Sequence, residues 1–347
     1  MRLTLVRAAA RPARGTLGAV QVVVLAGGVG GSRFVAGVRA AYPDAQLTVI
    51  VNTADDVTMH GLRICPDLDT MTYTLGGGID AERGWGRAAE TWRVKDELAA
   101  YGVEPTWFGL GDLDLGTHLA RTQLLAAGLP LSEVTRRITG RWLAHDPALR
   151  LLPMSDDVVE TEVAIADPAA GDGRRWLHFQ EYWVRLRAEP DALAIRRLGI
   201  EATRPAVGVV EAIESADLVL VGPSNPVVSI GPILEVPGIR AAITTTSAPV
   251  IGFAGILGGA PVLGMAHRLL PAIGVAVDAA AVGRHYGSRT TDGVLDLWVM
   301  DSADAASAAA LETDGLPSAV TGLIMSSPEA TAEFVRLAVK ALPRPGR

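Results

Sequence analysis

The chain has very little cysteine and no long apolar segment. Cys65 is the single cysteine among 347 residues. One cysteine excludes an internal disulfide framework and is typical of a reducing compartment. No stretch approaches the roughly 18 consecutive apolar residues that a membrane-spanning helix needs. We therefore expect a cytoplasmic protein that does not enter a membrane.

Basic residues are also too few for a nucleic-acid partner. The chain carries 31 Lys and Arg against 38 Asp and Glu, a formal net charge of −7. A net negative charge disfavours non-specific binding to phosphate backbones. The hydrophobic share of 49% and the 38 glycines instead suit a large enzyme that acts on small molecules.

Residues 1–19 differ from the rest of the chain. They contain four arginines and no acidic residue, together with Pro12 and Gly15. Their apolar run is too short for a secretory signal peptide. We expect them to form a disordered extension ahead of the folded part.

A strand, a glycine-rich turn and a helix are expected to follow this extension. Val22–Leu25 is an apolar, β-branched run typical of a buried strand, and apolar residues with helical spacing begin after Ser32. Glycines permit positive φ and let a phosphate approach the backbone N–H groups at a helix start. The pattern favours a nucleotide-phosphate site over a tight structural turn. The glycines of this turn are Gly27, Gly28, Gly30 and Gly31.

The glycine turn fits neither of the two commonest phosphate-binding motifs. A Walker motif needs Gly-Lys-Ser/Thr at the helix start, where this chain has Gly31-Ser32-Arg33. A dinucleotide fingerprint that begins at Gly28 would need glycine in place of Arg33. The next strand, Leu47–Val51, ends at Asn52, where a nicotinamide enzyme usually has an acid for the ribose. An ordinary dehydrogenase is therefore disfavoured.

Four carboxylates follow this second strand within fifteen residues. Asn52–Asp56 lies where open α/β sheets bind their ligands, and Asp67 and Asp69 precede the next apolar stretch. Carboxylates beside a phosphate site could hold a divalent cation such as Mg²⁺. Asp67 or Asp69 could equally cap the helix that begins near Thr70. The sequence leaves the two roles open.

A second polar loop follows a later strand. Ala216–Val221 predicts a buried strand, and Gly222-Pro223-Ser224-Asn225-Pro226 comes directly after it. Ser224 and Asn225 supply short hydrogen-bonding groups, and Pro223 stiffens the turn. This composition favours ligand contact over a plain connection.

Aromatic residues gather between the acidic cluster and the middle of the chain. A helix is expected over Arg87–Tyr101, and a strand over Trp107–Gly111. Trp85, Trp92 and Trp107 could form a platform for a flat heterocycle. For any single tryptophan, core packing is the favoured interpretation.

The alternation of strands and helices predicts an α/β fold with one doubly wound, mostly parallel sheet. Val158–Ala166 and Trp176–Leu186, separated by a Pro/Gly/Asp-rich turn, predict a β-hairpin outside that alternation. We therefore expect residues 20–142 and 201–347 to form a nucleotide-binding domain. Residues 143–200 would form an inserted, smaller α+β subdomain that contains the hairpin.

Several segments together resemble a known family. They are AGGVGGSRF, NTADD, PDLDT, LGDLDLGTH, LPMSDD, HFQEYW and GPSNPVVSIGPI, in this order. In combination they resemble the 2-phospho-L-lactate transferase family of deazaflavin coenzyme biosynthesis, and most closely its actinobacterial phosphoenolpyruvate transferase branch. The resemblance covers about residue 20 to the C-terminus. It implies a Rossmann-like domain with a smaller subdomain, a requirement for Mg²⁺ and a homodimer.

The resemblance also implies a reaction. The donor would be guanosine diphosphate linked to lactate or enolpyruvate, and the acceptor the ribityl hydroxyl of 7,8-didemethyl-8-hydroxy-5-deazariboflavin. A phosphoenolpyruvyl or 2-phospholactyl group would move between them, with release of GMP. Such a displacement at phosphorus relies mainly on positioning and charge neutralisation.

By the same resemblance, the glycine turn would hold the diphosphate, and Ser224 and Asn225 the guanosine. Asp56, Asp67 and Asp69 would coordinate Mg²⁺ or contact the acceptor hydroxyl. Asp56 or Asp69 could accept the hydroxyl proton, and the sequence does not choose between them.

Three further positions are expected to contact the substrates. Gly109 and Asp112 would border the deazaflavin pocket, and Asn52 lies at the ligand-binding edge of the sheet. Archaeal members of the family have a lysine near the position of Arg33, and Arg33 could replace its charge. This difference leaves the identity of the transferred acid open.

Two other functions stay open at this point. A guanylyl-type nucleotidyltransferase would also place a glycine pair and a basic residue after its first strand, and it would release pyrophosphate. A non-catalytic deazaflavin- or nucleotide-binding protein is less favoured. Four nearby carboxylates would hinder the binding of an anionic ligand unless a metal were present.

Overall fold

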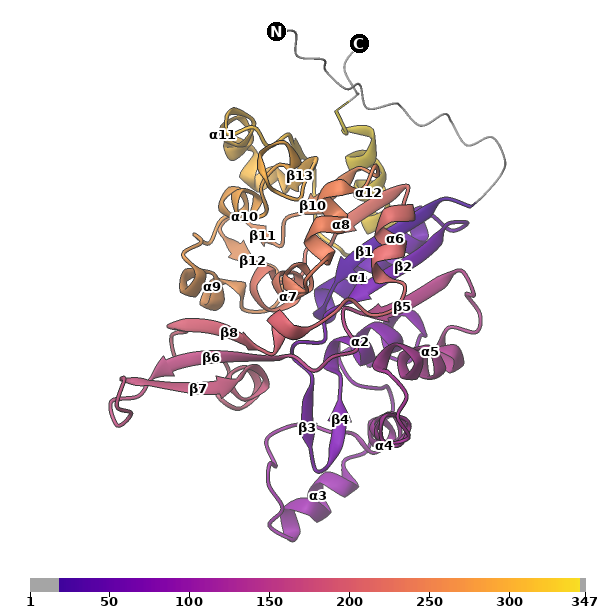
Figure 1. Ribbon diagram of the computed structural model, residues 1–347, viewed down its shortest axis with the longest axis vertical. Helices are drawn as coiled ribbons and strands as arrows, with labels where there is room; N and C mark the ends of the chain where they lie inside the picture. The colour runs from indigo at the N-terminus through magenta and orange to yellow at the C-terminus, as the bar shows by residue number, and fades with distance from the viewer. Residues whose placement is uncertain (1–18, 344–347) are drawn as a thin grey trace, which may run out of the picture.

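A seven-stranded parallel sheet forms the centre of the molecule, in the order β14-β13-β10-β9-β1-β2-β5. The computed structural model describes residues 19–343, so nearly all of the expected extension at residues 1–19 lies outside the described residues (Figure 1). The predicted doubly wound α/β fold is confirmed. The strands of the sheet are β1 (Gln21–Ala26), β2 (Gln46–Val51), β5 (Leu149–Pro153), β9 (Leu218–Val221), β10 (Val250–Phe253), β13 (Leu297–Met300) and β14 (Ser318–Val320).

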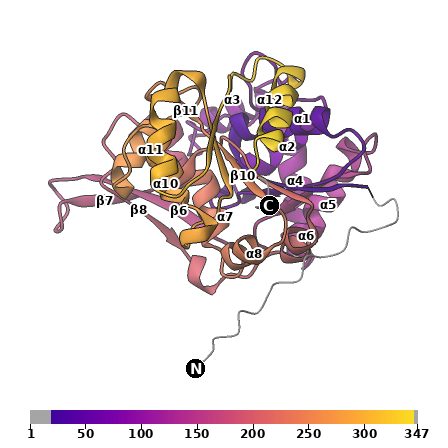
Figure 2. The ribbon, with the colours of Figure 1, turned by 90° about the horizontal axis from the view of Figure 1, so that it is seen from above.

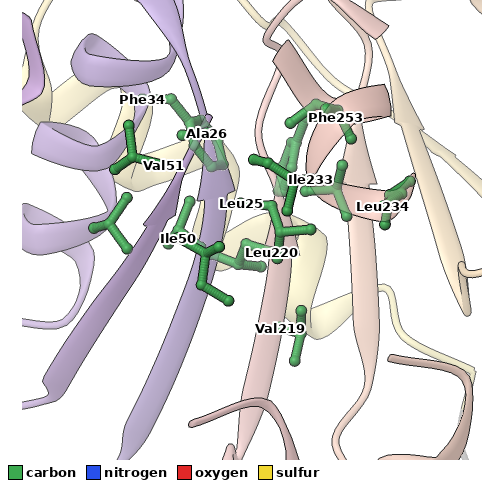
Figure 3. Packing of buried hydrophobic residues seen from close by; sticks show 14 of the residues in the cluster. Leu25, Ala26, Phe34, Ile50, Val51, Val219, Leu220, Ile233, Leu234 and Phe253 are labelled. Carbon is green, nitrogen blue, oxygen red and sulfur yellow. The ribbon is translucent and has the colours of Figure 1, made fainter. Parts of the chain in front are cut away.

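Strand β1 lies inside the sheet and is buried on both faces. It pairs in parallel with β2 on one side and with β9 on the other. Its residues Val22–Ala26 are buried, as expected for a central strand covered by helices on both faces. Figure 3 shows Leu25, Ile50 and Leu220 within this apolar packing.

Helices cover both faces of the sheet. Figure 2 shows α1 and α12 together on one face, and α6 and α8 on the other. The helices are α1 (Gly28–Ala41), α2 (Pro66–Leu75), α3 (Arg93–Ala100), α4 (Asp112–Ala126), α5 (Leu131–Trp142), α6 (Val209–Ser215), α7 (Gly231–Glu235), α8 (Ile239–Thr245), α9 (Ala266–Leu269), α10 (Ala279–Tyr286), α11 (Ala308–Thr313) and α12 (Pro328–Lys340).

Three small antiparallel sheets lie outside the central one. The largest has the order β7-β6-β8, and its β6–β7 pair is the hairpin that the sequence predicts. The other two are the hairpins β3–β4 and β11–β12. Figure 1 shows β3–β4 and β6–β7–β8 projecting from the sheet as separate extensions. These strands are β3 (Val57–Met59), β4 (Leu62–Ile64), β6 (Glu160–Ala166), β7 (Arg174–His178), β8 (Ala194–Leu198), β11 (Ile256–Leu257) and β12 (Ala260–Pro261).

The sequence-based boundary at residue 143 needs correction. Strand β5 pairs with β2 in the central sheet, although it falls in the range assigned to the inserted subdomain. The hairpin is also shorter than expected, because Glu181–Arg185 forms a π-helical turn instead of continuing the second strand. Beyond these points, the division into domains stays a prediction.

The segment between α2 and α4 differs most from the expectation. The helix predicted over Arg87–Tyr101 is only α3, and the strand predicted over Trp107–Gly111 does not form. Gly84 and Gly86 both adopt positive φ, which interrupts helical structure before α3. Helix α3 has no buried residue, so tertiary packing does not extend it.

Within residues 19–343, no single helix is long and apolar enough to cross a membrane. Two consecutive helical segments, Pro226–Glu235 and Ile239–Thr245, meet the length and composition criteria when taken together, with a bend of 84° between them.

Close packing between α1 and α12 gives a stability prediction. A Cβ at Gly37 would lie 2.1 Å from Cγ2 of the buried Thr331, so Gly37→Ala should force the two helices apart. We expect a loss of about 1–3 kcal/mol in the free energy of unfolding, measured with urea. Gly116→Ala in α4 is the control, since its Cβ would meet nothing within 4 Å. That variant should gain about 0.5–1 kcal/mol from helix propensity, and equal effects would contradict the packing argument.

Candidate active site

The order of the strands reverses direction between β1 and β9. The chain passes from β1 to β2 on one side of the sheet, and from β9 to β10 on the other. Such a switch point opens a crevice beyond the carboxyl ends of the strands, where α/β proteins bind ligands. The glycine turn follows β1, and the loop Gly222–Asn225 follows β9. The two predicted ligand loops are therefore neighbours.

Ser224 joins these two loops directly. Its hydroxyl donates to the Gly27 carbonyl at 2.8 Å, and the Gly27 N–H donates to the same hydroxyl at 3.1 Å. A Cβ at Gly31 would lie 2.5 Å from the Ser224 Oγ, so only glycine allows this approach. Gly28, with φ of +67°, starts helix α1 in the conformation that favours glycine.

Asn52, directly after β2, connects three chain segments through its side chain. Its buried amide nitrogen lies 3.0 Å from Asp67 Oδ2, 3.1 Å from Asp55 Oδ2 and 3.1 Å from the Val228 carbonyl oxygen. Its side-chain oxygen accepts a hydrogen bond from the Ala54 N–H at 3.0 Å. The acidic segment after β2, the start of α2 and the segment after β9 thus share one side chain.

Asp67 lies at the N-terminus of α1, where the sequence predicts a phosphate. A Cβ at Gly27 would be 2.5 Å from its Oδ2, which makes this glycine necessary. Burial raises the pKa of Asp67 to about 6, although hydrogen bonds from Asn52 and the Gly28 N–H favour the ionised form. The glycine turn and the acidic cluster are therefore in contact.

Asp55 and Asp56 are buried with incomplete hydrogen bonding. Burial, followed by the nearby Asp67 charge, raises the pKa of Asp55 well above its usual value. Burial also raises the pKa of Asp56 to about 7, and the Arg63 guanidinium, 3.6 Å away, opposes the rise. Among the described residues, neither oxygen of Asp56 nor Oδ1 of Asp55 accepts a well-formed N–H or O–H hydrogen bond; the Cys65 thiol lies beside Asp56, and the Thr161 hydroxyl beside Asp55. Buried carboxylates with free oxygens fit a divalent cation.

Asp69 has a different environment, because the Arg121 guanidinium already neutralises its carboxylate. Both of its oxygens accept hydrogen bonds from the buried Arg121 guanidinium, and His118 Nδ1 lies 3.7 Å away. His118 in turn contacts Asp114 at 3.2 Å, and the Tyr73 hydroxyl donates to Asp114 at 2.6 Å. Ligand atoms of Asp69, Asp114 and His118 lie within 4.8 Å of one another. Arg121 nevertheless fills the position where a cation would meet Asp69.

Four residues that the sequence predicts to contact the substrates either cap a helical segment or lie apart from the buried aspartates. The Asp112 carboxylate accepts hydrogen bonds from the Arg93 and Val94 N–H groups and so caps α3. Asn225 caps the π-helical turn Pro226–Ile230 in the same way. Two others border the irregular segment before α3. A Cβ at Gly109 would lie 3.2 Å from the Trp85 ring, and the exposed Arg33 lies beside Gly84.

Comparison with known proteins identifies the family of this chain. The family model described as 2-phospho-L-lactate transferase CofD matches residues 22–318. The chain belongs to this transferase family. It is therefore an enzyme that transfers substituted phosphate groups.

Curated members of the CofD family align over nearly the whole chain. A phosphoenolpyruvate transferase of Nocardia farcinica is 54% identical over 319 residues, covering 92% of this chain and 94% of the relative. One of Streptomyces griseus is 54% identical over 322 residues and covers 92% and 98%. One of Mycobacterium sp. (strain KMS) is 51% identical over 334 residues, again covering 92% and 98%.

A solved structure supports the fold of this chain. A UPF0052-family protein of Bacillus halodurans superposes with a TM-score of 0.60 at 17% identity, covering 92% of this chain and 100% of that protein. At this identity the likeness concerns the fold alone.

Sequence reasoning missed several residues around the candidate site. The Gln180 side chain donates to the Asp55 carbonyl at 3.2 Å, and the Thr161 N–H donates to the Ala54 carbonyl at 2.7 Å. Strand β6 and the segment after β7 thus pack against the Asn52–Asp56 segment. Arg121 could have been noticed, because it follows His118 by one helical turn in α4. Its partner Asp69 lies 52 positions earlier, and no local pattern reveals that pairing.

The raised pKa of Asp56 gives a prediction for stability without divalent cations. Its folded value of about 7 exceeds its usual value of 3.8, so the folded state holds more protons between these pH values. Stability should therefore fall as the pH rises from 5 to 8. In Asp56→Asn this fall should be smaller by at least about 1 kcal/mol, measured by urea unfolding with a chelator. The exposed-site control Asp44→Asn should keep the wild-type slope, and an unchanged slope in Asp56→Asn would refute the assignment.

Proposed function

We propose that this enzyme transfers a phosphoenolpyruvyl or 2-phospholactyl group from a guanosine diphosphate-linked donor. The acceptor is the ribityl hydroxyl of 7,8-didemethyl-8-hydroxy-5-deazariboflavin, and GMP is released. The observation that carries the proposal is the contact between Asp67 and the glycine turn at the switch point of the sheet. It combines an amide-rich phosphate site with carboxylates suited to a cation. The names of the curated relatives support the three-carbon unit.

The bond changes define what the protein must supply. The acceptor oxygen forms a bond to the phosphorus that carries the three-carbon acid, and the phosphoanhydride bond to GMP breaks. The hydroxyl proton leaves to a base, and negative charge develops on the departing phosphate. Backbone N–H groups at the start of α1 bind non-bridging oxygens, so they favour this charge.

Asp56 is the carboxylate best suited to accept the proton. A pKa of about 7 lies close to a neutral working pH, which is where a general base is most effective. Its oxygens also receive no N–H or O–H hydrogen bond from the described residues, so they are available. Asp69 is less suited to this role, because Arg121 binds both of its oxygens.

Mg²⁺ is the cation that these carboxylates fit. Asp55 and Asp67 would hold it, because both carboxylates lie within 3.1 Å of the Asn52 amide nitrogen. When bound, the ion would neutralise the diphosphate and stabilise the leaving group. Asp67 and the diphosphate would both lie at the N-terminus of α1, beside its backbone N–H groups. A cation between them would reduce the repulsion of the two negative groups.

Product analysis tests the function directly. The enzyme is incubated with the deazaflavin and with each donor, the phosphoenolpyruvyl or the 2-phospholactyl guanosine diphosphate, and the products are identified by mass spectrometry. We expect a deazaflavin phosphodiester and GMP in equal amounts. Release of pyrophosphate from GTP, without a deazaflavin product, would instead identify the nucleotidyltransferase. Ligand binding without any product would identify a binding protein.

Two substitutions separate the roles of the aspartates. Asp56→Asn should keep the fold and lower turnover at least roughly tenfold, since the proposed base is lost. Asp69→Asn should instead cost about 3–5 kcal/mol of stability, because Arg121 would stay buried without its partner. Turnover and urea unfolding are measured for both, with Asp44→Asn as the control. Wild-type turnover in Asp56→Asn would remove it from the mechanism.

Metal binding should depend on pH in a defined direction. The carboxyls of Asp55 and Asp67, whose pKa values are raised by burial, that of Asp67 to about 6, must ionise to bind Mg²⁺. Added Mg²⁺ should therefore raise the melting temperature more at pH 8 than at pH 5. Asp67→Asn should reduce the effect at pH 8. Equal stabilisation at both pH values would argue against these ligands.

A further inference from the structure

One cavity is lined by residues outside the glycine turn and the acidic cluster. Its volume is about 420 Å³, and it lies between α7, the start of α8 and the end of α10. This volume falls within the usual range for sites of small molecules. Leu234 and Val236 form apolar walls, and Arg240, His285 and Tyr286 bring polar groups.

The charges around this cavity are mainly positive. Arg240 is exposed and donates one hydrogen bond to the Asp292 carbonyl. The other N–H donors of its guanidinium are therefore available to a ligand. Burial lowers the pKa of His285, and Arg240 and Arg197 lower it further. Glu235 is the single acid of the lining, and Arg197 neutralises it through hydrogen bonds of 2.6 and 2.8 Å. The cavity therefore has unbalanced positive charge.

Arg197 lies just behind the cavity wall. A Cβ at Gly231 would be 3.2 Å from its Nη2, so the bare backbone of Gly231 lets the guanidinium approach. The side chain is 10% exposed, and its Nε has no hydrogen-bond partner among the described residues. Arg197 also donates to the Val227 carbonyl, next to the Val228 carbonyl that Asn52 contacts. The cavity and the acidic cluster thus flank the same segment after β9.

We propose that this cavity is a binding site for a small phosphate-bearing molecule, separate from the transfer site. The anionic group lies between Arg240 and His285, and the apolar walls contact the rest of the ligand. Arginine suits this role because its planar guanidinium presents several donors to phosphate oxygens. His285 adds a donor that strengthens when it is protonated.

The titration of His285 provides a test that needs no catalytic activity. The ring signals of the six histidines are followed by NMR between pH 5 and 8, and the spectrum of His285→Gln assigns the signal of interest. Sulfate is one probe, because it stays a dianion over this range, and GMP is the other. A bound anion favours the protonated ring, so the pKa of His285 should rise by about one unit at saturation. Matched sodium chloride corrects for general screening.

Two arginine variants make the test specific. In Arg240→Gln, most of the anion-induced rise in the pKa of His285 should be lost, because the main partner of the anion is removed. Arg284→Gln is the matched control, since Arg284 lies on the same helix as His285 but pairs with Asp314 outside the lining. It should leave the rise intact.

The result decides whether the cavity binds an anion. If sulfate alone raises the pKa of His285, an inorganic anion is sufficient for binding. If GMP binds more tightly than sulfate, the preferred ligand is a nucleotide. An unchanged titration with both probes, or equal effects of the two arginine variants, overturns the proposal. Because the readout is local to His285, failure of the transfer assay would not affect it.

Discussion

The carboxamide of Asn52 is the interaction on which the candidate site depends most. It lies within 3.0–3.1 Å of two carboxylates and of a carbonyl from the segment after β9. Three chain segments separated by up to 176 positions therefore meet at one side chain. The parallel sheet makes this possible, because it brings the carboxyl ends of β1, β2 and β9 to one edge. An acidic residue in place of Asn52 could not donate to these acceptors, which explains the departure from the dinucleotide-binding pattern.

Much of this arrangement could be predicted from the sequence. The run Val22–Leu25, followed by glycines, gives β1 and the start of α1, and the strands Leu47–Val51 and Leu218–Val221 follow from apolar, β-branched runs. Since parallel strands share one carboxyl edge, convergence of the loops after them is an expected result. The contacts of Ser224 with Gly27 and of Asn52 with Asp67 bear this out. The functions assigned to these residues stay predictions.

Other features depend on contacts that no local pattern encodes. Arg121 pairs with Asp69 across 52 positions, and this pairing separates Asp69 from the more available Asp56. Asp112 is expected to border the deazaflavin pocket, and this role stays a prediction, while its hydrogen bonds in the structure are those of a helix cap. The segment around Trp85 and Gly109 differs from the secondary structure expected of it. Its irregular backbone is set by positive-φ glycines and by aromatic packing, not by apolar periodicity.

The position of Asp67 has a consequence for the sequence of binding events. A carboxylate of the protein faces the N-terminal N–H groups of α1, so this site carries its own negative charge. A diphosphate that arrived alone would meet like charge at close range, and its association would be slow and weak. The proposed Mg²⁺, held by these carboxylates, would instead attract the diphosphate. For the proposed donor and metal, this placement would favour ordered addition, with the metal entering before the nucleotide or together with it.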